Sequence, residues 1–463
     1  MTEPIDVVVV GAGLSGLQAA LTLNEAGRSV LVLEARDRVG GKTYSVQRPD
    51  GKGVQEMGAA WLNDSSQSMV WSYCQKFGLT PVVQNIQGLV ASEDDDGDCQ
   101  LFPFGGMPEF GKGVLDNITA LRDYVETASL DPKTFEHPRR AELDNISFEK
   151  FCKDAGAGTK ALQTARVWCR GTTGQDPGDV SALAYLEVCR GASGLIKLRY
   201  DGKDGAQNLR LREGTQAISI NMAKLPPAGT IKLSTPVTSI STAPEKDTFS
   251  ITTSNGLPFT ARKVIVSIPS PAYKNITFDP PLPAPYQHHV SNVRYGCFVK
   301  YICTFKTPFW RRKGACGLTQ SFRGPMNHCR DTSVDQDGNY ALTCFLCSGP
   351  GREWLALGAE HRKEAVLRQL SSLFETSFEE VVGEFSDSLT SEWMDDPWAG
   401  WGCPFAIAPP GVMDAERILE VAAGDAGGLY FVGTELTDEW RGYMEGALRS
   451  GKKGAEVVLH SLR

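Results

Sequence analysis

The chain has 463 residues, of which 41% are hydrophobic and 22% charged, a balance that excludes a disordered or fibrous protein. Its 47 basic and 55 acidic residues give a net charge of −8, which argues against a broad electrostatic grip on nucleic acid or anionic membrane. Length alone predicts about three domains.

Twelve cysteines would suit a disulfide framework in a small secreted protein, but we expect free thiols in a chain this long that opens Met-Thr-Glu-Pro. The longest uncharged stretch, 7–24, is broken by glycines and predicts a strand, a turn and a helix, not a membrane span. We therefore expect a soluble, cytoplasmic protein without a membrane anchor or a nucleic-acid partner. A homodimer is a candidate assembly.

The first predicted element is a buried strand of four valines, 7–10, which runs into Gly11-Ala12-Gly13-Leu14-Ser15-Gly16. A helix follows, and a second apolar strand, 30–33, ends at Glu34. Glycines at a helix N-terminus let the backbone approach a pyrophosphate, and an acidic residue after the second strand can accept hydrogen bonds from ribose hydroxyls. This unit predicts a dinucleotide site formed by Gly11, Gly13, Ser15, Gly16 and Glu34.

A second glycine-rich, basic loop follows at once: Ala35-Arg36-Asp37-Arg38-Val39-Gly40-Gly41-Lys42-Thr43. It resembles the second fingerprint of flavoprotein amine oxidases, in which this loop lies along the FAD pyrophosphate and the isoalloxazine edge. The family usually has Arg at the position of Lys42, so this chain keeps the charge and loses the bidentate fork. The resemblance assigns five residues to FAD: Ala35, Arg36, Gly41, Lys42 and Thr43.

Further segments match in family order. Glu56-Met57-Gly58-Ala59-Ala60-Trp61 resembles the stretch beside the flavin in monoamine and polyamine oxidases, and Val237 matches the valine whose backbone meets adenine. Segments 264–269 and 278–283 resemble the strand that returns to the FAD domain and the entry to the substrate domain. The additional FAD contacts that this implies are Gly58, Ala59, Ala60, Trp61 and Val237.

The segment 299–310 predicts a strand and contains Lys300. It resembles a monoamine oxidase strand in which a lysine holds a water against flavin N5. The resemblance gives Lys300 that catalytic position. From the residue pattern alone, a lysine on the solvated face of an alternating strand explains the segment equally well.

The last segments, 428–435 and 440–447, resemble the flavin amine oxidase signature almost residue for residue. They predict a strand, a loop and a helix whose N-terminus would face flavin N1 and O2 and stabilise negative charge there. The resemblance assigns Gly433, Thr434, Glu435, Tyr443 and Met444 to the cofactor. Tyr443 would also form one aromatic wall of the substrate channel.

The segment 393–411 opens with Trp393, which the resemblance places at the cofactor, and closes with Pro-Pro-Gly. Counting back from Pro-Pro-Gly puts Cys403 on the cysteine that tethers FAD in membrane monoamine oxidases. Counting forward from Trp393 misses it by one, so a covalent link and a buried free thiol both remain open. In those enzymes two tyrosines form an aromatic cage for the substrate, and Pro404 stands at the position of the second one. Phe405 is therefore the candidate for that wall.

Other catalytic machinery is hard to assemble from this sequence. The six histidines show no metal-ligand spacing, and Cys344-x-x-Cys347 lacks a second pair. The acidic run Asp94-Asp95-Asp96 predicts a solvated loop. We therefore expect no metal, which suits chemistry in which a flavin accepts the electrons.

The predicted fold class is α/β (α+β): a Rossmann-like FAD-binding domain of the glutathione reductase and amine oxidase type, interleaved with a mixed-sheet and helical substrate domain. The FAD-binding domain would comprise 1–82, 210–285 and 393–463. The substrate-binding domain would comprise 83–209, mostly helical, and 286–392, with strands from near Arg294.

The implied activity is FAD-dependent oxidative deamination of a primary amine by O2, which gives a carbonyl compound, ammonia and hydrogen peroxide. A long-chain aliphatic amine such as a fumonisin-type amino-polyol is a candidate substrate. An L-amino acid oxidase would need an arginine for the carboxylate, with Arg190, Arg199 and Arg441 as candidates. A polyamine oxidase would need an acidic residue such as Glu187. A flavin-binding scaffold without turnover is the alternative from another class.

Overall fold

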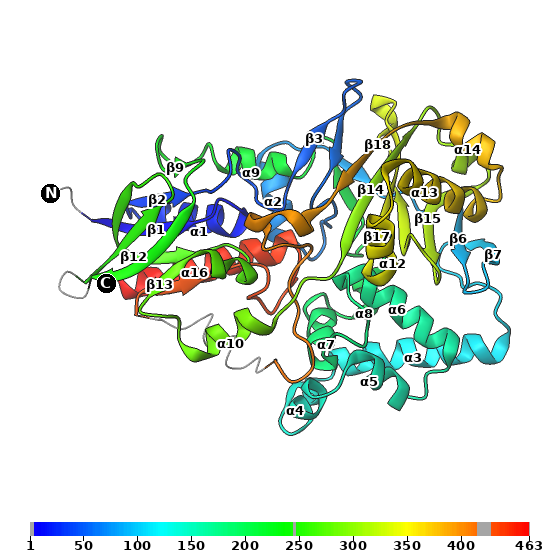
Figure 1. Ribbon diagram of the computed structural model, residues 1–463, viewed down its shortest axis with the longest axis horizontal. Coiled ribbons are helices and arrows are strands. Elements are labelled where there is room, and N and C mark those ends of the chain that lie inside the picture. Colours follow the sequence, from blue (N-terminus) through cyan, green and yellow to red (C-terminus); the bar gives the residue numbers. More distant parts are fainter. Residues whose placement is uncertain (1–3, 244–246, 414–426, 463) are drawn as a thin grey trace.

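The computed structural model describes residues 4–243, 247–413 and 427–462, which form two lobes, each built around one sheet (Figure 1). The sheet of the first lobe has the order β13-β10-β11-β12-β1-β2-β9, with β19 also paired to β12. Its parallel strands are β1 (Ile5–Val10), β2 (Val30–Leu33), β9 (Ile231–Lys232), β12 (Pro258–Val266) and β19 (Leu429–Phe431). The remaining strands are β10 (Val237–Ala243), β11 (Thr248–Thr253) and β13 (Thr277–Asp279); β11 is antiparallel to β10 and β12, and β13 is parallel to β10.

Successive residues of β1 point into two different cores. Val7 and Val9 pack with helices α1 (Leu14–Glu25) and α16 (Met444–Ser461), whereas Val8 and Val10 pack with β10 and β11. Because both faces of the strand are covered, it reads as an unbroken run of valines.

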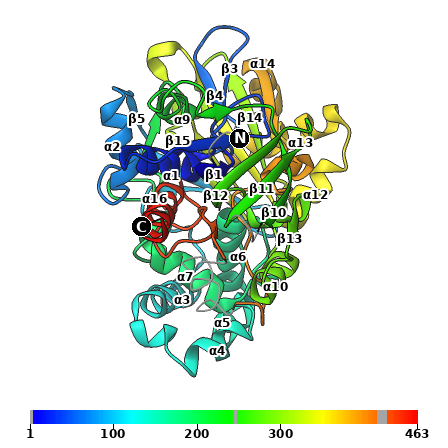
Figure 2. The same cartoon turned by 90° about the vertical axis from the view of Figure 1, so that its left-hand side faces the viewer.

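Helices α1 and α16 lie side by side (Figures 1 and 2). Their contact depends on small residues, since a Cβ added at Gly451 would lie 2.2 Å from the Ser15 carbonyl oxygen. A Cβ at Gly16 would lie 2.1 Å from the Gly11 carbonyl oxygen. The close packing holds the N-terminus of α1 against the carboxyl end of β1.

The sheet of the second lobe has the order β18-β14-β17-β16-β15-β6-β7. Its strands are β6 (Leu89–Glu93), β7 (Cys99–Pro103), β14 (Phe298–Phe305), β15 (Ala315–Ser321), β16 (His328–Asp331), β17 (Tyr340–Cys347) and β18 (Phe385–Ser391). One face packs on α12 (Ser348–Leu355) and α13 (Ala359–Leu373), and it receives Val299, Tyr301 and Cys303 of β14. The alternation of the strand therefore turns Lys300 to the other face.

The second lobe also contains a helical layer, seen below its sheet in Figure 1. The layer comprises α3 (Lys112–Leu130), α4 (Arg139–Asp144), α5 (Phe148–Asp154), α6 (Thr159–Thr173), α7 (Ala182–Gly191) and α8 (Leu195–Arg199). Phe148 and Tyr185 pack at its centre, with ring centroids 4.1 Å apart. Shorter elements are α2 (Ser68–Lys76), α9 (Gln216–Met222), α10 (Ala284–Asn292), α11 (Phe309–Arg312), α14 (Phe378–Glu384), β3 (Ser45–Gln47), β4 (Val54–Glu56), β5 (Pro81–Val83) and β8 (Leu209–Leu211).

Two details differ from the sequence expectation. Segment 83–209 contributes β6 and β7 as well as helices: the two strands form a hairpin, and β6 also pairs with the distant β15. Strand β14 begins at Phe298, and Arg294 forms only an isolated bridge to Ile407. All twelve cysteines are unpaired, as predicted. Among the described residues, no helix is both long and apolar enough to cross a bilayer.

Candidate functional site

A cavity of about 300 Å³ receives side chains and backbone from both lobes. Most of the predicted site residues line it, and they come from segments far apart in the chain. They are Gly11, Gly13, Ser15, Glu34, Ala35, Arg36, Gly41, Lys42, Thr43, Gly58, Ala59, Ala60, Trp61, Val237, Lys300, Cys403, Phe405, Gly433, Thr434, Glu435, Tyr443 and Met444.

Two predicted residues are not part of the lining. Gly16 lies behind the turn, where its role is the close approach to Gly11. Trp393 is buried and its indole Nε1 donates to the Met57 carbonyl at 2.9 Å. We therefore regard both as supports of the neighbouring backbone and not as walls of the cavity.

One end of the cavity has the features of a dinucleotide cradle. Gly11 has φ +100°, and a Cβ added at Gly13 or Gly433 would meet no atom within 4 Å, so bare backbone borders open space there. The Glu34 carboxylate accepts from the amides of Ala12 (2.6 Å) and Arg36 (2.9 Å). Burial raises the pKa of Glu34, and these two hydrogen bonds oppose that rise. The residues fit a pyrophosphate beside the N-terminus of α1 and ribose hydroxyls at the carboxylate.

Lys42 belongs to a buried polar network. Its ammonium donates to the Tyr295 hydroxyl and to the Pro404 carbonyl (3.2 Å). The Tyr295 hydroxyl donates to Glu435 (2.8 Å), which also accepts from the Ser270 hydroxyl at 2.6 Å. Burial lowers the pKa of Lys42, whereas Lys42 and the hydrogen bonds hold the pKa of Glu435 below its usual range against the effect of burial.

Lys300 is buried beneath the stretch 56–61. Its ammonium donates to the carbonyls of Glu56 (3.1 Å) and Gly58. Burial lowers the pKa of Lys300 to about 8, with the Glu56 carboxylate opposing the shift. The side chain is 7% exposed, so the solvated-face interpretation of this lysine is wrong. The reason is that β14 lies between β17 and β18 and is covered on both faces.

The other end of the cavity is lined by strands of the second sheet. The pairing register sets Lys300 of β14 opposite Phe345 of β17, and Phe345 opposite His328 of β16. These three side chains therefore form one row across the sheet. The Tyr443 hydroxyl accepts a hydrogen bond from Gln207 Nε2 at 3.1 Å. Six residues line the cavity at this end: Arg199, Gln207, His328, Arg330, Phe345 and Tyr443.

Comparison with known proteins gives the family. The sequence model of one protein family, the flavin containing amine oxidoreductases, matches residues 14–459. The chain belongs to this family. Its resemblance to flavin amine oxidases is thereby confirmed: the protein is a flavin-dependent amine oxidase, and its cofactor is FAD.

Similar amine oxidases cover the whole chain. It is 28% identical to a probable flavin-containing monoamine oxidase A of Dictyostelium discoideum over 100% of this chain and 99% of that one. It is also 28% identical to the human flavin-containing amine oxidase B, covering 100% of this chain and 87% of that protein.

Solved structures share the fold. A putrescine oxidase bound to putrescine superposes with a TM-score of 0.90 at 24% identity, covering 99% of both chains. Cyclohexylamine oxidase from Brevibacterium oxydans IH-35A gives a TM-score of 0.89 at 24% identity, covering 99% of this chain and 100% of that one. The predicted fold class is confirmed.

Several cavity residues of this amine oxidase were not predicted from the sequence. They are Gly171, Thr172, Leu198, Gln207, Phe298, His328, Arg330 and Phe345, whereas Arg199 was one of three candidate arginines. The alternation of His328 and Arg330 around Cys329 is a weak signal for a strand with one polar face. Nothing in that signal indicates that this strand lies next to β17.

Other candidates lie elsewhere. Arg441 and Arg140 both pair with Glu187, at 3.5 and 3.1 Å, and Arg190 packs on the Phe135 ring. None of these four side chains lines the cavity of this amine oxidase.

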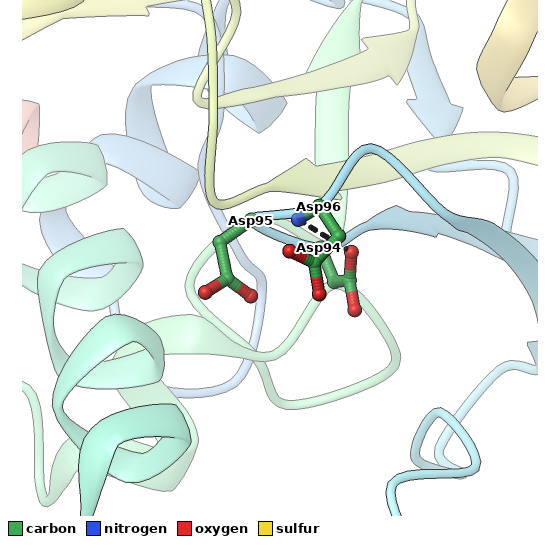
Figure 3. Close-up of side chains that lie close together, drawn as sticks. All are labelled: Asp94, Asp95 and Asp96. Carbon is green, nitrogen blue, oxygen red and sulfur yellow. Dashed lines mark hydrogen bonds between the residues drawn. The ribbon is translucent and has the colours of Figure 1, made fainter.

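The acidic loop Asp94-Asp95-Asp96 lies between β6 and β7 (Figure 3). Lys160 forms ion pairs with Asp94 (3.1 Å) and Asp95, and the Asp96 amide donates to Asp94 at 2.9 Å. Lys160 offsets one of the three negative charges of this loop.

Proposed function

We propose that the protein catalyses oxidative deamination of a primary amine. One amine, one water and one O2 are converted to a carbonyl compound, ammonia and hydrogen peroxide. The observation that carries the proposal is that one cavity is lined both by the dinucleotide cradle at Glu34 and by Lys300 and Tyr443.

Bound FAD supplies the two-electron acceptor. The protein's part is to present the amine uncharged and correctly oriented. Aromatic side chains of Trp61, Phe345 and Tyr443 line the approach, and desolvation by such walls favours the neutral form of an amine. Lys300 would hold a water molecule at the reacting edge of the cofactor through its remaining N–H group.

The named substrates of the two structural neighbours are putrescine and cyclohexylamine, and both compounds are primary amines. A polyamine substrate is less well supported. Glu187, the candidate acidic residue for it, forms ion pairs with Arg140 and Arg441 and does not line the cavity. A long-chain amino-polyol of the fumonisin type remains a prediction, and no cavity residue selects it.

The direct test is anaerobic mixing of the purified flavoprotein with a panel of primary amines. The proposal predicts loss of the oxidised flavin absorbance, followed on admission of O2 by equal yields of peroxide, ammonia and carbonyl product. A flavin that no amine bleaches would support the scaffold alternative.

A further inference from the structure

Two guanidinium groups lie at the end of the cavity that is lined by the second sheet, which we call the substrate end. Arg199 is the last residue of α8, and Arg330 stands on β16 beside His328. The guanidinium carbon of Arg330 lies 5.4 Å from the centroid of the Trp61 ring, and the Lys300 ammonium lies at the same distance from that ring. Positive charge is thus concentrated where the substrate would bind.

The charge of Arg330 is already compensated. Its Nε donates to Asp201 at 2.9 Å, and Asp201 is 3% exposed. This buried pair is an intact structural unit, since a buried charge needs such a partner.

Arg199 has no comparable partner. Its one hydrogen bond is from Nη1 to the Trp168 carbonyl at 3.4 Å, and no carboxylate within the described residues forms an ion pair with it. Burial lowers the pKa of Arg199, which reports the cost of holding this charge away from water. A guanidinium placed in this way in a cavity wall fits an anionic ligand, and its planar fork suits a carboxylate.

A second donor lies close to Arg199. A Cβ built on Gly171 would be 3.4 Å from both Arg199 Nη1 and His328 Cε1, so the two side chains converge on one spot of the wall. Asn327 Nδ2 lies 3.1 Å from His328 Nδ1. Burial and the charges of Arg330 and Arg199 hold the pKa of His328 well below its usual value, so the ring is neutral. With Nδ1 accepting from Asn327, Nε2 carries the proton and is a hydrogen-bond donor.

The acidic side chains of the lining are elsewhere. Among the described residues that border the cavity, the carboxylates are Glu34 and Glu435, and both belong to the cofactor side. A second amino group on the substrate would therefore meet cations at the substrate end, and a carboxylate would meet Arg199.

We infer that Arg199, assisted by His328, forms an anion subsite, and that the substrate class is a primary amine that also carries a carboxylate. The oxidation of the amino group in this inference rests on the proposed function. The binding of an anion at Arg199 does not depend on it. The cross-strand row from Lys300 through Phe345 to His328 spans two strand spacings, about 10 Å, which suits a short aliphatic spacer.

The test uses six-carbon compounds that differ only in charge: hexylamine, 1,6-diaminohexane, 6-aminohexanoate and norleucine. Anaerobic flavin reduction by the holoenzyme should saturate at least tenfold lower in concentration for 6-aminohexanoate than for hexylamine, the diamine or norleucine. The two amino carboxylates distinguish a remote carboxylate from one adjacent to the amine.

Substitution should then remove that preference. Arg199→Gln should raise the half-saturating concentration of the preferred amino carboxylate by about 10- to 100-fold and weaken hexylamine far less. Arg199→Lys should recover part of the loss. Arg190→Gln is the matched control, because Arg190 packs on Phe135 outside the lining, and it should leave the preference intact. Equal losses for all amines in Arg199→Gln, or no preference in the unaltered enzyme, would overturn the inference.

Hexanoate separates this inference from the proposed function. As a carboxylate without an amino group, it should perturb the flavin spectrum of the holoenzyme at concentrations at which hexanol does not, and Arg199→Gln should abolish the effect. Selective hexanoate binding with no reduction by any amine would support the anion subsite and contradict amine turnover. Reduction by hexylamine without selective hexanoate binding would support amine turnover and contradict the anion subsite.

Discussion

The buried ammonium of Lys300 donates hydrogen bonds to two backbone carbonyls. Its protonation state can be followed through the pH dependence of the reaction with O2. Burial lowers its pKa to about 8, so the group is charged below pH 8 and neutral above it. A positive charge beside the flavin favours electron transfer to O2, because negative charge develops on the oxygen. We therefore expect kcat/KM for O2 to fall about tenfold between pH 7 and pH 9.

Lys300→Met should lower kcat/KM for O2 at pH 7 by about 10- to 100-fold and abolish its fall above pH 8. Lys306→Met, at an exposed position just beyond the same strand, is the matched control and should retain the profile of the unaltered enzyme. An unchanged pH profile in Lys300→Met would exclude Lys300 as the titrating group.

Cys403 is the cysteine that lines the cavity, and Lys42 and Lys300 oppose the rise that burial causes in its pKa. The pKa nevertheless stays above its usual value, so the group is mainly the thiol, whereas the thiolate is the reactive form. The covalent link predicts yellow cofactor that precipitates with the protein in acid and is released from Cys403→Ala. Cys99→Ala, outside the lining, should still retain it. Colour that stays entirely in the supernatant with the unaltered protein would rule out the covalent link.

At the residue scale, the glycine-rich turn and Glu34 could be predicted because their spacing is set by one short βαβ unit. The environment of Lys42 could not, since Tyr295 and Ser270 are more than two hundred residues away in the sequence. The same limit applies to Arg199: the sequence marked it as one of three candidate arginines, and only the tertiary arrangement distinguishes it from Arg190 and Arg441.

Among the elements, the contact between α1 and α16 is the one that most directly shapes the cofactor cradle. A Cβ at Gly451 would lie 2.2 Å from the Ser15 carbonyl oxygen, which is backbone and cannot rotate away. Gly451→Ala should therefore push the helices apart and lower the free energy of unfolding by about 1–3 kcal/mol, with weaker retention of flavin.

Thermal denaturation of the holoenzyme measures this effect. Gly383→Ala is the matched control, because Gly383 is also helical but, unlike Gly451, is exposed, and its added Cβ would meet nothing within 4 Å. That change should be neutral or slightly stabilising. Equal stability of the two variants would show that the close approach of the helices is not needed.

Elements with strong local patterns were predictable. Strand β2 has the bounds that the apolar run 30–33 indicates, and α3 and α6 lie in segment 83–209, which the sequence predicted to be mostly helical. Strands β6 and β7 were missed: they form a hairpin, and β6 joins the sheet through its pairing with the distant β15. Sequence periodicity does not report such distant pairing.

At the scale of the whole molecule, the two sheets meet the cavity in different ways. The first presents strand ends and glycine turns, which suit a dinucleotide, and the second presents the broad face of β14, β17 and β16. The domain boundaries remain a prediction. They assign residues 1–82, 210–285 and 393–463 to the FAD-binding domain and residues 83–209 and 286–392 to the substrate-binding domain.

The central claim is that this cavity brings a primary amine to bound FAD for oxidation. Anaerobic titration of the flavoprotein with primary amines, six-carbon amino carboxylates included, tests it most directly. We predict stoichiometric bleaching of the flavin and recovery of its absorbance on readmission of O2, with one equivalent of peroxide. Full retention of the oxidised spectrum with every amine would contradict the claim.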